Sequence, residues 1–124
     1  MFQEIKAKRG YSALDVRCTL KKNSDFRRLY SKGKSAVTPY MVVYCRRNGR
    51  GCNRLGYTAS VKLGHAVVRN RVRRRLREIY RLNAPALKTG FDIVIVARSR
   101  SVGAEYRRMN EAFLTACRKL ELLR

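Results

Sequence analysis

The order of apolar and polar residues along the chain predicts three helices. A short helix is expected after the cap residues 22–25, because Phe26, Leu29 and Tyr30 share one face, and it should end near Gly33. A long helix is expected over residues 66–82. A third, amphipathic helix is expected near the C-terminus, where apolar residues recur in steps of three and four. Its apolar stripe consists of Tyr106, Met109, Phe113, Ala116, Cys117 and Leu120.

Three further segments have the composition of strands. Residues 35–47 are rich in β-branched and aromatic side chains, and Pro39 places the early part at a sheet edge. Residues 55–62 alternate between apolar and polar positions and follow a Gly-rich turn at 48–53, which predicts an antiparallel hairpin with one polar face. Residues 91–97 are almost continuously apolar, as in a central strand buried on both faces.

These elements define the expected fold class. The order α-β-β-α-β-α predicts an α/β protein, a two-layer α-β sandwich, without an internal repeat. A chain of 124 residues suits one domain, which we place at residues 19–124. Residues 1–18 are basic and lack sustained periodicity, so we expect them to form a flexible N-terminal extension.

The balance of charged residues gives the first indication of function. Thirty Lys and Arg residues oppose eight acids, which leaves a net charge of +22. Such self-repulsion destabilises a compact domain unless a polyanion lies against it, and nucleic acid is the polyanion that best explains the balance. The longest strongly apolar run, 93–97, is far too short to span a bilayer, and no apolar block follows the first charges as in a signal peptide. We therefore expect a cytoplasmic protein.

The predicted long helix separates its apolar and charged residues. At 100° per residue, its apolar positions fall within an arc of about 80° that must face the core. A second arc of about 140° is almost entirely cationic. The core arc holds Val68, Val72, Leu76 and Ile79, and the cationic arc holds Arg69, Asn70, Arg73, Arg74, Arg77 and Arg81, with Arg71 and Arg75 on the other edge of the core stripe.

Solvation alone does not explain this face. Solvated helix faces usually alternate in sign to form i,i+4 pairs, whereas this helix carries a single acid, Glu78. Its cations are all arginine, whose planar guanidinium binds phosphate through two hydrogen bonds and stacks on bases. A broad arc of such groups suits folded RNA, which presents phosphates on several sides.

The remaining reactive residues do not form an active site or a metal site by their spacing. The acids are scattered, and His65 has no evident partner, so we expect no catalytic residue and no bound metal. The four cysteines lack a C-x-x-C pair, which leaves zinc and disulfides weakly supported. Cys117 is expected in the core, and a cross-strand contact between Cys45 and Cys52 stays open.

The long helix also carries a specific motif. Its sequence Gly64-x-Ala66-Val67-x-Arg69-Asn70-Arg71-x-x-Arg74-x-x-Arg77-Glu78 resembles the signature of the bacterial ribonuclease P protein subunit. The resemblance extends from about Thr19 to the C-terminus. It includes Leu20-Lys21-Lys22-Asn23-x-Asp25-Phe26, Arg54-Leu55-Gly56-Tyr57-Thr58-x-Ser60-x-Lys62 and Asp92-Ile93-Val94-Ile95-Val96-Ala97-Arg98.

The resemblance implies a function. Members of this family are the non-catalytic protein component of an endoribonuclease: they bind a large catalytic RNA, which uses Mg²⁺ to cleave the 5′ leader from precursor tRNA. The protein itself would then bind no cofactor. The family fold has a β-α-β crossover through the Arg-rich helix, of left-handed sense, whereas general handedness rules favour the opposite.

The resemblance also implies two RNA-binding surfaces. The residues that match the motif contacting the catalytic RNA are Arg69, Asn70, Arg71, Arg73, Arg74 and Arg77. A cleft between the first helix and the sheet would hold the single-stranded leader, with matching residues Lys22, Phe26, Tyr30, Tyr44, Thr58, Ser60 and Lys62. Aromatic, hydroxyl and lysine side chains suit that role. From the residues alone, Phe26 fits a core anchor equally well, and Tyr44 fits sheet packing.

Three other functions compete with this hypothesis. A ribosomal or other structural RNA-binding protein would share the charge but not the aromatic cleft. A DNA-binding module would need a helix-turn-helix around the Arg-rich helix, which strands flank instead. A stand-alone nuclease would need clustered carboxylates.

Overall fold

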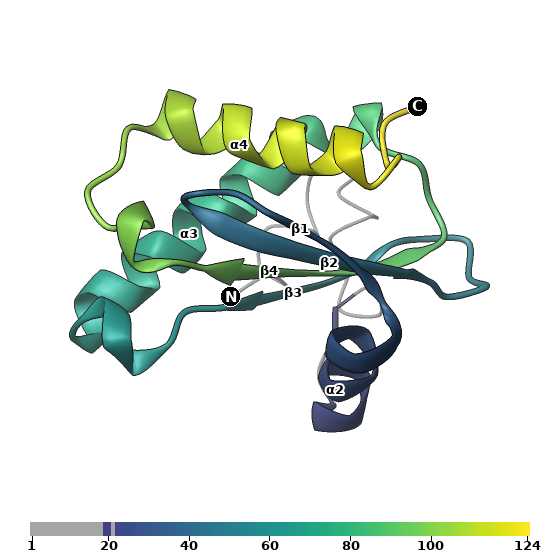
Figure 1. The fold of residues 1–124 in the computed structure, drawn as a ribbon, viewed down its shortest axis with the longest axis horizontal. Helices are drawn as coiled ribbons and strands as arrows, with labels where there is room; N and C mark the ends of the chain where they lie inside the picture. The colour runs from purple at the N-terminus through teal and green to yellow at the C-terminus, as the bar shows by residue number, and fades with distance from the viewer. Residues whose placement is uncertain (1–18, 21) are drawn as a thin grey trace, which may run out of the picture.

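A four-stranded mixed sheet carries helices on both of its faces in the computed structural model, which describes residues 19–20 and 22–124 (Figure 1). The expected basic extension, residues 1–18, lies outside the described residues. The helices are α2 (Asn23–Lys32), α3 (Ala66–Asn83) and α4 (Tyr106–Lys119); the strands are β1 (Lys34–Val37), β2 (Met41–Arg47), β3 (Arg54–Thr58) and β4 (Phe91–Ala97); short 3₁₀ turns are η3 (Val61–Leu63), η4 (Ala84–Ala86) and η5 (Ser99–Ser101).

The predicted α/β class and element order are confirmed, apart from one extra strand. The segment predicted as one strand, residues 35–47, is a hairpin of β1 and β2. Its turn contains Pro39, which cannot donate to a strand ladder. The side chain of Thr38 closes the turn: Oγ1 donates to the Met41 carbonyl at 2.8 Å and accepts from the Met41 amide at 3.0 Å.

The antiparallel pairing of residues 35–47 with 55–62 is wrong. The strands lie in the order β1-β2-β4-β3, with β4 antiparallel to β2 and parallel to β3. β4 takes the central place because its residues 92–95 are buried on both faces. The polypeptide between β3 and β4 forms α3, so the β-α-β crossover through the Arg-rich helix is confirmed; its handedness stays a prediction.

The core lies mainly on one face of the sheet. There α3 and α4 cover β2, β3 and β4, and the largest buried side chains include Tyr80 and Phe113. This face with its two helices is the predicted sandwich. α2 lies on the opposite face (Figure 1), over a smaller cluster of Leu20, Leu29 and Val94. Because one ten-residue helix covers only part of that face, Val42 and Val96 stay partly exposed beside it.

The described cysteines are free thiols. Cys45 and Cys117 are buried in the main core, as expected for Cys117, and Cys52 is half-buried in the β2–β3 loop. The two strands beside β2 are β1 and β4, so Cys45 and Cys52 are not cross-strand partners. Within the described part of the chain, no helix has the length and apolar character needed to cross a membrane.

Candidate nucleic-acid interface

The predicted core stripe of the Arg-rich helix is confirmed, with one addition. Val72, Leu76 and Ile79 are buried and Val68 is half-buried. Tyr80 is buried as well, although its helical position falls within the cationic arc. It is buried because β3 and the segment before it pack against this side of α3, where the Asn53 side chain donates a hydrogen bond to the Tyr80 hydroxyl at 3.4 Å.

One row of arginines therefore lies along the edge of the sheet. Arg69, Arg73 and Arg77 follow one another at four-residue steps and are half-buried, with the Nε atoms of Arg69 and Arg77 shielded from solvent. Arg73 donates to the Asn70 side chain at 2.8 Å and to the Ala59 carbonyl at 3.5 Å. Burial raises the pKa of the neighbouring Tyr57 hydroxyl, an effect that Arg77 partly offsets. The half-buried side chains of Arg69, Arg73 and Arg77 hold their guanidinium groups in place beside β3.

A second row faces outward. Asn70, Arg71 and Arg74 are exposed, and no described carboxylate forms an ion pair with Arg71 or Arg74. Arg81 differs, because its guanidinium pairs with Glu78 at 2.6 Å. Arg75 donates to the Ala104 carbonyl. The "arginine face", here Asn70, Arg71 and Arg74 with the row beside β3, thus differs from the arc predicted from the helical pattern: it lacks Arg81 and includes Arg71.

The aromatic residues predicted for the leader meet under α2. The Tyr30 and Tyr44 rings lie edge to face, with centroids 4.9 Å apart. A side-chain hydrogen bond links Tyr30 to Thr58, and burial raises the pKa of the Tyr30 hydroxyl. The Phe26 ring lies directly on Gly56, where a Cβ atom would approach it to 2.7 Å. Four of the residues predicted to bind the leader therefore lie together, although they come from α2, β2 and β3. They are Phe26, Tyr30, Tyr44 and Thr58.

The other predicted residues lie at the ends of this group, which we call the aromatic cleft. Lys22 is exposed and precedes α2 as its N-cap. Ser60 and Lys62 are exposed after β3, where the Ser60 hydroxyl accepts a hydrogen bond from the Lys62 amide at 3.3 Å. Hydroxyls and lysines at the rim of an aromatic surface suit the backbone of a single strand whose bases stack below.

The sequence indicated Thr58 but not the two valines that complete the floor of the cleft. Thr58, Val96 and Val42 are register neighbours across β3, β4 and β2, and all three are half-buried. They share the sheet face of Tyr44, beyond the area that α2 covers. In the sequence, Val96 is indistinguishable from the other apolar residues of β4. It is partly exposed only because α2 does not cover that part of the sheet.

The described residues gather two kinds of side chain that can bind nucleic acid. No three His, Cys, Asp or Glu side chains among them come together as a metal site requires. What the fold brings together is cations on α3 and aromatic rings under α2. Both sets border β3, so a nucleic acid bound at one lies close to the other.

The sequence is similar to that of known RNA-processing proteins. A family model described as Ribonuclease P matches residues 14–121. The Ribonuclease P protein component of Alkaliphilus oremlandii is 43% identical over 104 residues, which cover 84% of this chain and 91% of that protein. The one of Natranaerobius thermophilus is 41% identical over 105 residues, which cover 85% and 91%.

Solved structures give the same result. The RNase P protein of Staphylococcus aureus superposes with a TM-score of 0.78 at 30% identity, covering 86% of this chain and 98% of that one. That of Thermotoga maritima has a TM-score of 0.72 at 34% identity, covering 78% and 92%. The match in sequence extends over most of the chain and the match in fold covers 78–86% of it, so the chain belongs to the ribonuclease P protein family.

Proposed function

We propose that this chain is the protein subunit of a ribonucleoprotein ribonuclease P and acts in maturing the 5′ end of tRNA, with the cytoplasm as its expected location. The observation that carries the proposal is the arginine face and the aromatic cleft on either side of β3. A ribosomal or other structural RNA-binding protein would need the first surface but not the second, and the family membership does not favour that alternative.

In this proposal the arginine face binds the catalytic RNA. Arg71 and Arg74 are exposed and have no described carboxylate partner, so each can form charge-assisted hydrogen bonds to phosphate. Arg69 and Arg73 are partly fixed by the packing beside β3. Guanidinium groups already held in position lose less conformational entropy when RNA binds.

The aromatic cleft binds the 5′ leader of precursor tRNA. Bases stack on or beside Phe26, Tyr30 and Tyr44, and the hydroxyls of Thr58 and Ser60 with Lys22 and Lys62 contact the sugar-phosphate backbone. A leader is single-stranded, so its bases are free to leave their neighbours and meet aromatic rings.

The chemistry is assigned to the catalytic RNA and its Mg²⁺. Most described acids are engaged in ion pairs: Asp25 and Asp92 with Arg54, Glu78 with Arg81, and Glu105 with Arg108. Carboxylates that neutralise arginines are poor ligands for a catalytic metal pair. The protein contributes binding, and through it the position of the substrate.

Reconstitution tests the proposal. The purified protein, added to a ribonuclease P RNA at low Mg²⁺, should restore cleavage of precursor tRNA at the leader junction. The protein alone should cleave nothing. Leader removal by protein that has been treated with micrococcal nuclease, or a failure to stimulate the RNA at any protein concentration, would contradict it.

A further inference from the structure

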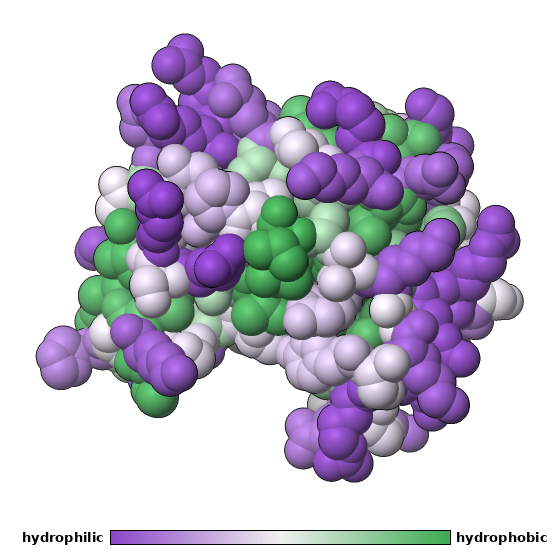
Figure 2. Space-filling view, in the orientation of Figure 1, coloured by the Kyte–Doolittle hydropathy of each residue, from purple (hydrophilic) through white to green (hydrophobic). Residues whose placement is uncertain are grey.

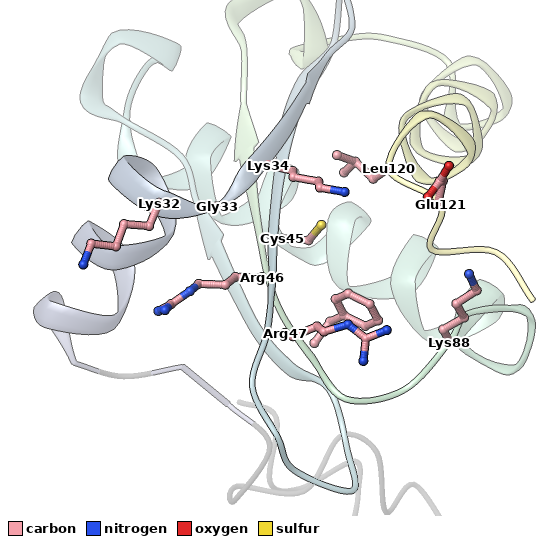
Figure 3. Close-up of a pocket in the computed structure, with 10 residues that line it drawn as sticks. Lys32, Gly33, Lys34, Cys45, Arg46, Arg47, Lys88, Leu120 and Glu121 are labelled. Carbon is pink, nitrogen blue, oxygen red and sulfur yellow. The ribbon is translucent and has the colours of Figure 1, made fainter.

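A hollow of about 280 Å³ lies where β2 ends, between the last turns of α2 and α4 (Figure 3). Gly33, Cys45, Phe91 and Leu120 form its apolar part. Its charged lining consists of five cations and one acid. The cations are Lys32, Lys34, Arg46, Arg47 and Lys88, and the acid is Glu121. We call this site the basic pocket.

The basic pocket is separate from the arginine face and from the rim of the aromatic cleft that carries Lys62. Arg47 pairs with Phe91 at one end of the β2–β4 ladder, whereas Met41 pairs with Ala97 at the other. Thr58, four residues before Lys62 in the chain, pairs with Val96 near that second end. The Lys62 rim therefore lies near the end of the sheet opposite to the pocket. No residue of α3 lines the pocket.

The charges of the pocket are not balanced within the described structure. The C-terminal ends of α2 and α4 each contribute about half a negative charge, and Glu121 adds one more. About two negative charges thus face five cations. None of the five forms an ion pair with a described carboxylate. Such an excess, gathered from four chain segments, costs folding energy unless an anion occupies the site.

The cations surround the end of the sheet from both sides. In Figure 3, Lys34, Arg47 and Lys88 lie on the α4 side, and Lys32 and Arg46 point toward the α2 side. The Arg47 guanidinium lies 5.6 Å from the centroid of the Phe91 ring, which fixes its direction. The hollow is smaller than the roughly 300–1,000 Å³ of pockets that enclose a drug-sized ligand. It suits a phosphate group with part of its nucleotide.

Two cations of the pocket, Lys32 and Arg46, lie on the side of the sheet that carries the aromatic cleft. Arg46 lies two residues after Tyr44 on the same face of β2, about 7 Å away along the strand. Lys32 follows Tyr30 at the end of α2. Figure 2 shows a band of hydrophilic side chains from the end of α4 down to α2, over the same part of the surface. A strand stacked at the Tyr30–Tyr44 pair would therefore meet Arg46 and Lys32 first as it passes toward the end of the sheet.

We propose that the basic pocket binds backbone phosphates of the 5′ leader, beyond the nucleotides that contact Tyr30 and Tyr44. This inference rests on the proposed function, because it extends the leader's path. It predicts that affinity increases again when the leader is lengthened past the cleft. The contact would be independent of leader sequence, since phosphates carry no base identity.

The test uses the reconstituted ribonucleoprotein and the double variant Lys34→Gln/Lys88→Gln. Both lysines are exposed and their removal relieves cation repulsion, so the fold should persist and the melting temperature should not fall. Precursor tRNAs with long, short and no leader are compared for binding over a range of salt. For the long leader, the slope of log affinity against log salt should flatten by about one to one and a half units, from two lost single-strand phosphate contacts. The short leader, the mature tRNA and the catalytic RNA should bind as before.

The matched control is Arg107→Gln/Arg108→Gln, which removes the same charge from the first turns of α4, away from the pocket. It should leave the long-leader slope unchanged. Equal losses in both double variants would mean a general charge effect, and a loss for the catalytic RNA alone would assign the pocket to that RNA; either result overturns the inference. Tyr30→Ala separates leader binding in the aromatic cleft from phosphate binding in the basic pocket. If Tyr30→Ala reduces leader binding while the pocket variant does not, only the further inference fails.

Discussion

The guanidinium of Arg54 on β3 donates two hydrogen bonds to the carboxylate of Asp92 on β4, Nε to Oδ1 at 2.7 Å and Nη2 to Oδ2 at 2.6 Å. Its third nitrogen lies 3.8 Å from the carboxylate of Asp25 on α2. One arginine thus connects two strands to the helix that carries Phe26 and Tyr30. Asn48 donates a further hydrogen bond to Asp92 at 2.9 Å, which adds the β2–β3 loop to the network.

Arg54→Ala should lower the free energy of unfolding by about 3–5 kcal/mol, because it leaves Asp92 buried without its cation. Urea unfolding followed by circular dichroism measures this. The control is Arg108→Ala, which breaks an ion pair whose two side chains are each 65% exposed and should leave stability almost unchanged. Similar losses in the two variants would contradict the structural role of Arg54.

The sequence predicted the helices better than the sheet, for a physical reason. Helical periodicity is local, so Ala66–Asn83 and its buried stripe followed from the spacing of Val72, Leu76 and Ile79. The place of β4 between β2 and β3 depends on contacts between residues far apart in the chain. The apolar run Phe91–Ala97 indicated a central strand but could not name its neighbours.

The candidate site shows the same limit. The cations of α3 were found from the helical pattern, yet Arg81 looks equivalent to Arg74, and Arg75 to Arg71, until Glu78 and the Ala104 carbonyl are placed beside them. The aromatic cleft required the family resemblance, since its residues come from α2, β2 and β3. The network of Arg54 joins positions in the sequence that carried no recognisable spacing.

The arginine face should bind RNA through phosphates. With about six contacts, log affinity should fall with log salt at a slope of roughly −4 to −5, and Arg73→Gln/Arg77→Gln should flatten it by one to two units. Arg71 and Arg74 are exposed, whereas Arg73 and Arg77 are half-buried. Arg71→Gln/Arg74→Gln should therefore flatten the slope without lowering the melting temperature. Filter binding to the catalytic RNA at several salt concentrations measures both. An unchanged slope would mean that the face is only solvated.

Stability should fall at alkaline pH because of a core thiol. Burial, and then the nearby Cys45, raises the pKa of Cys117 from about 9 to about 12. Below pH 9 the thiol is protonated in both states. Between pH 9 and 12 the unfolded state loses the proton first, which lowers the free energy of unfolding by up to about 1.4 kcal/mol per pH unit. Urea unfolding at pH 8, 9 and 10 should show a shallower decline for Cys117→Ala than for the wild type; parallel declines would contradict this.

Phe26 should contribute both to the fold and to leader binding. Stacking of a base on an aromatic ring is worth about 1–3 kcal/mol, so Phe26→Ala should weaken binding of a precursor with a long leader by roughly five- to a hundredfold. Because its ring also packs on Gly56, the variant should have a lower melting temperature as well. Tyr30 is 43% exposed, so Tyr30→Ala should weaken leader binding with a smaller loss of stability.

The series of long, short and absent leaders separates these two roles. A stacking contact is lost only when a nucleotide occupies the cleft, so mature tRNA should bind both variants as it binds the wild type, and affinity for the catalytic RNA should barely change. Gly56→Ala gives an independent test, since its added Cβ atom would meet the Phe26 ring at 2.7 Å and displace it without removing an aromatic side chain. It should therefore reduce long-leader binding in the same pattern. Equal losses for every RNA in the series would leave Phe26 as a packing residue only.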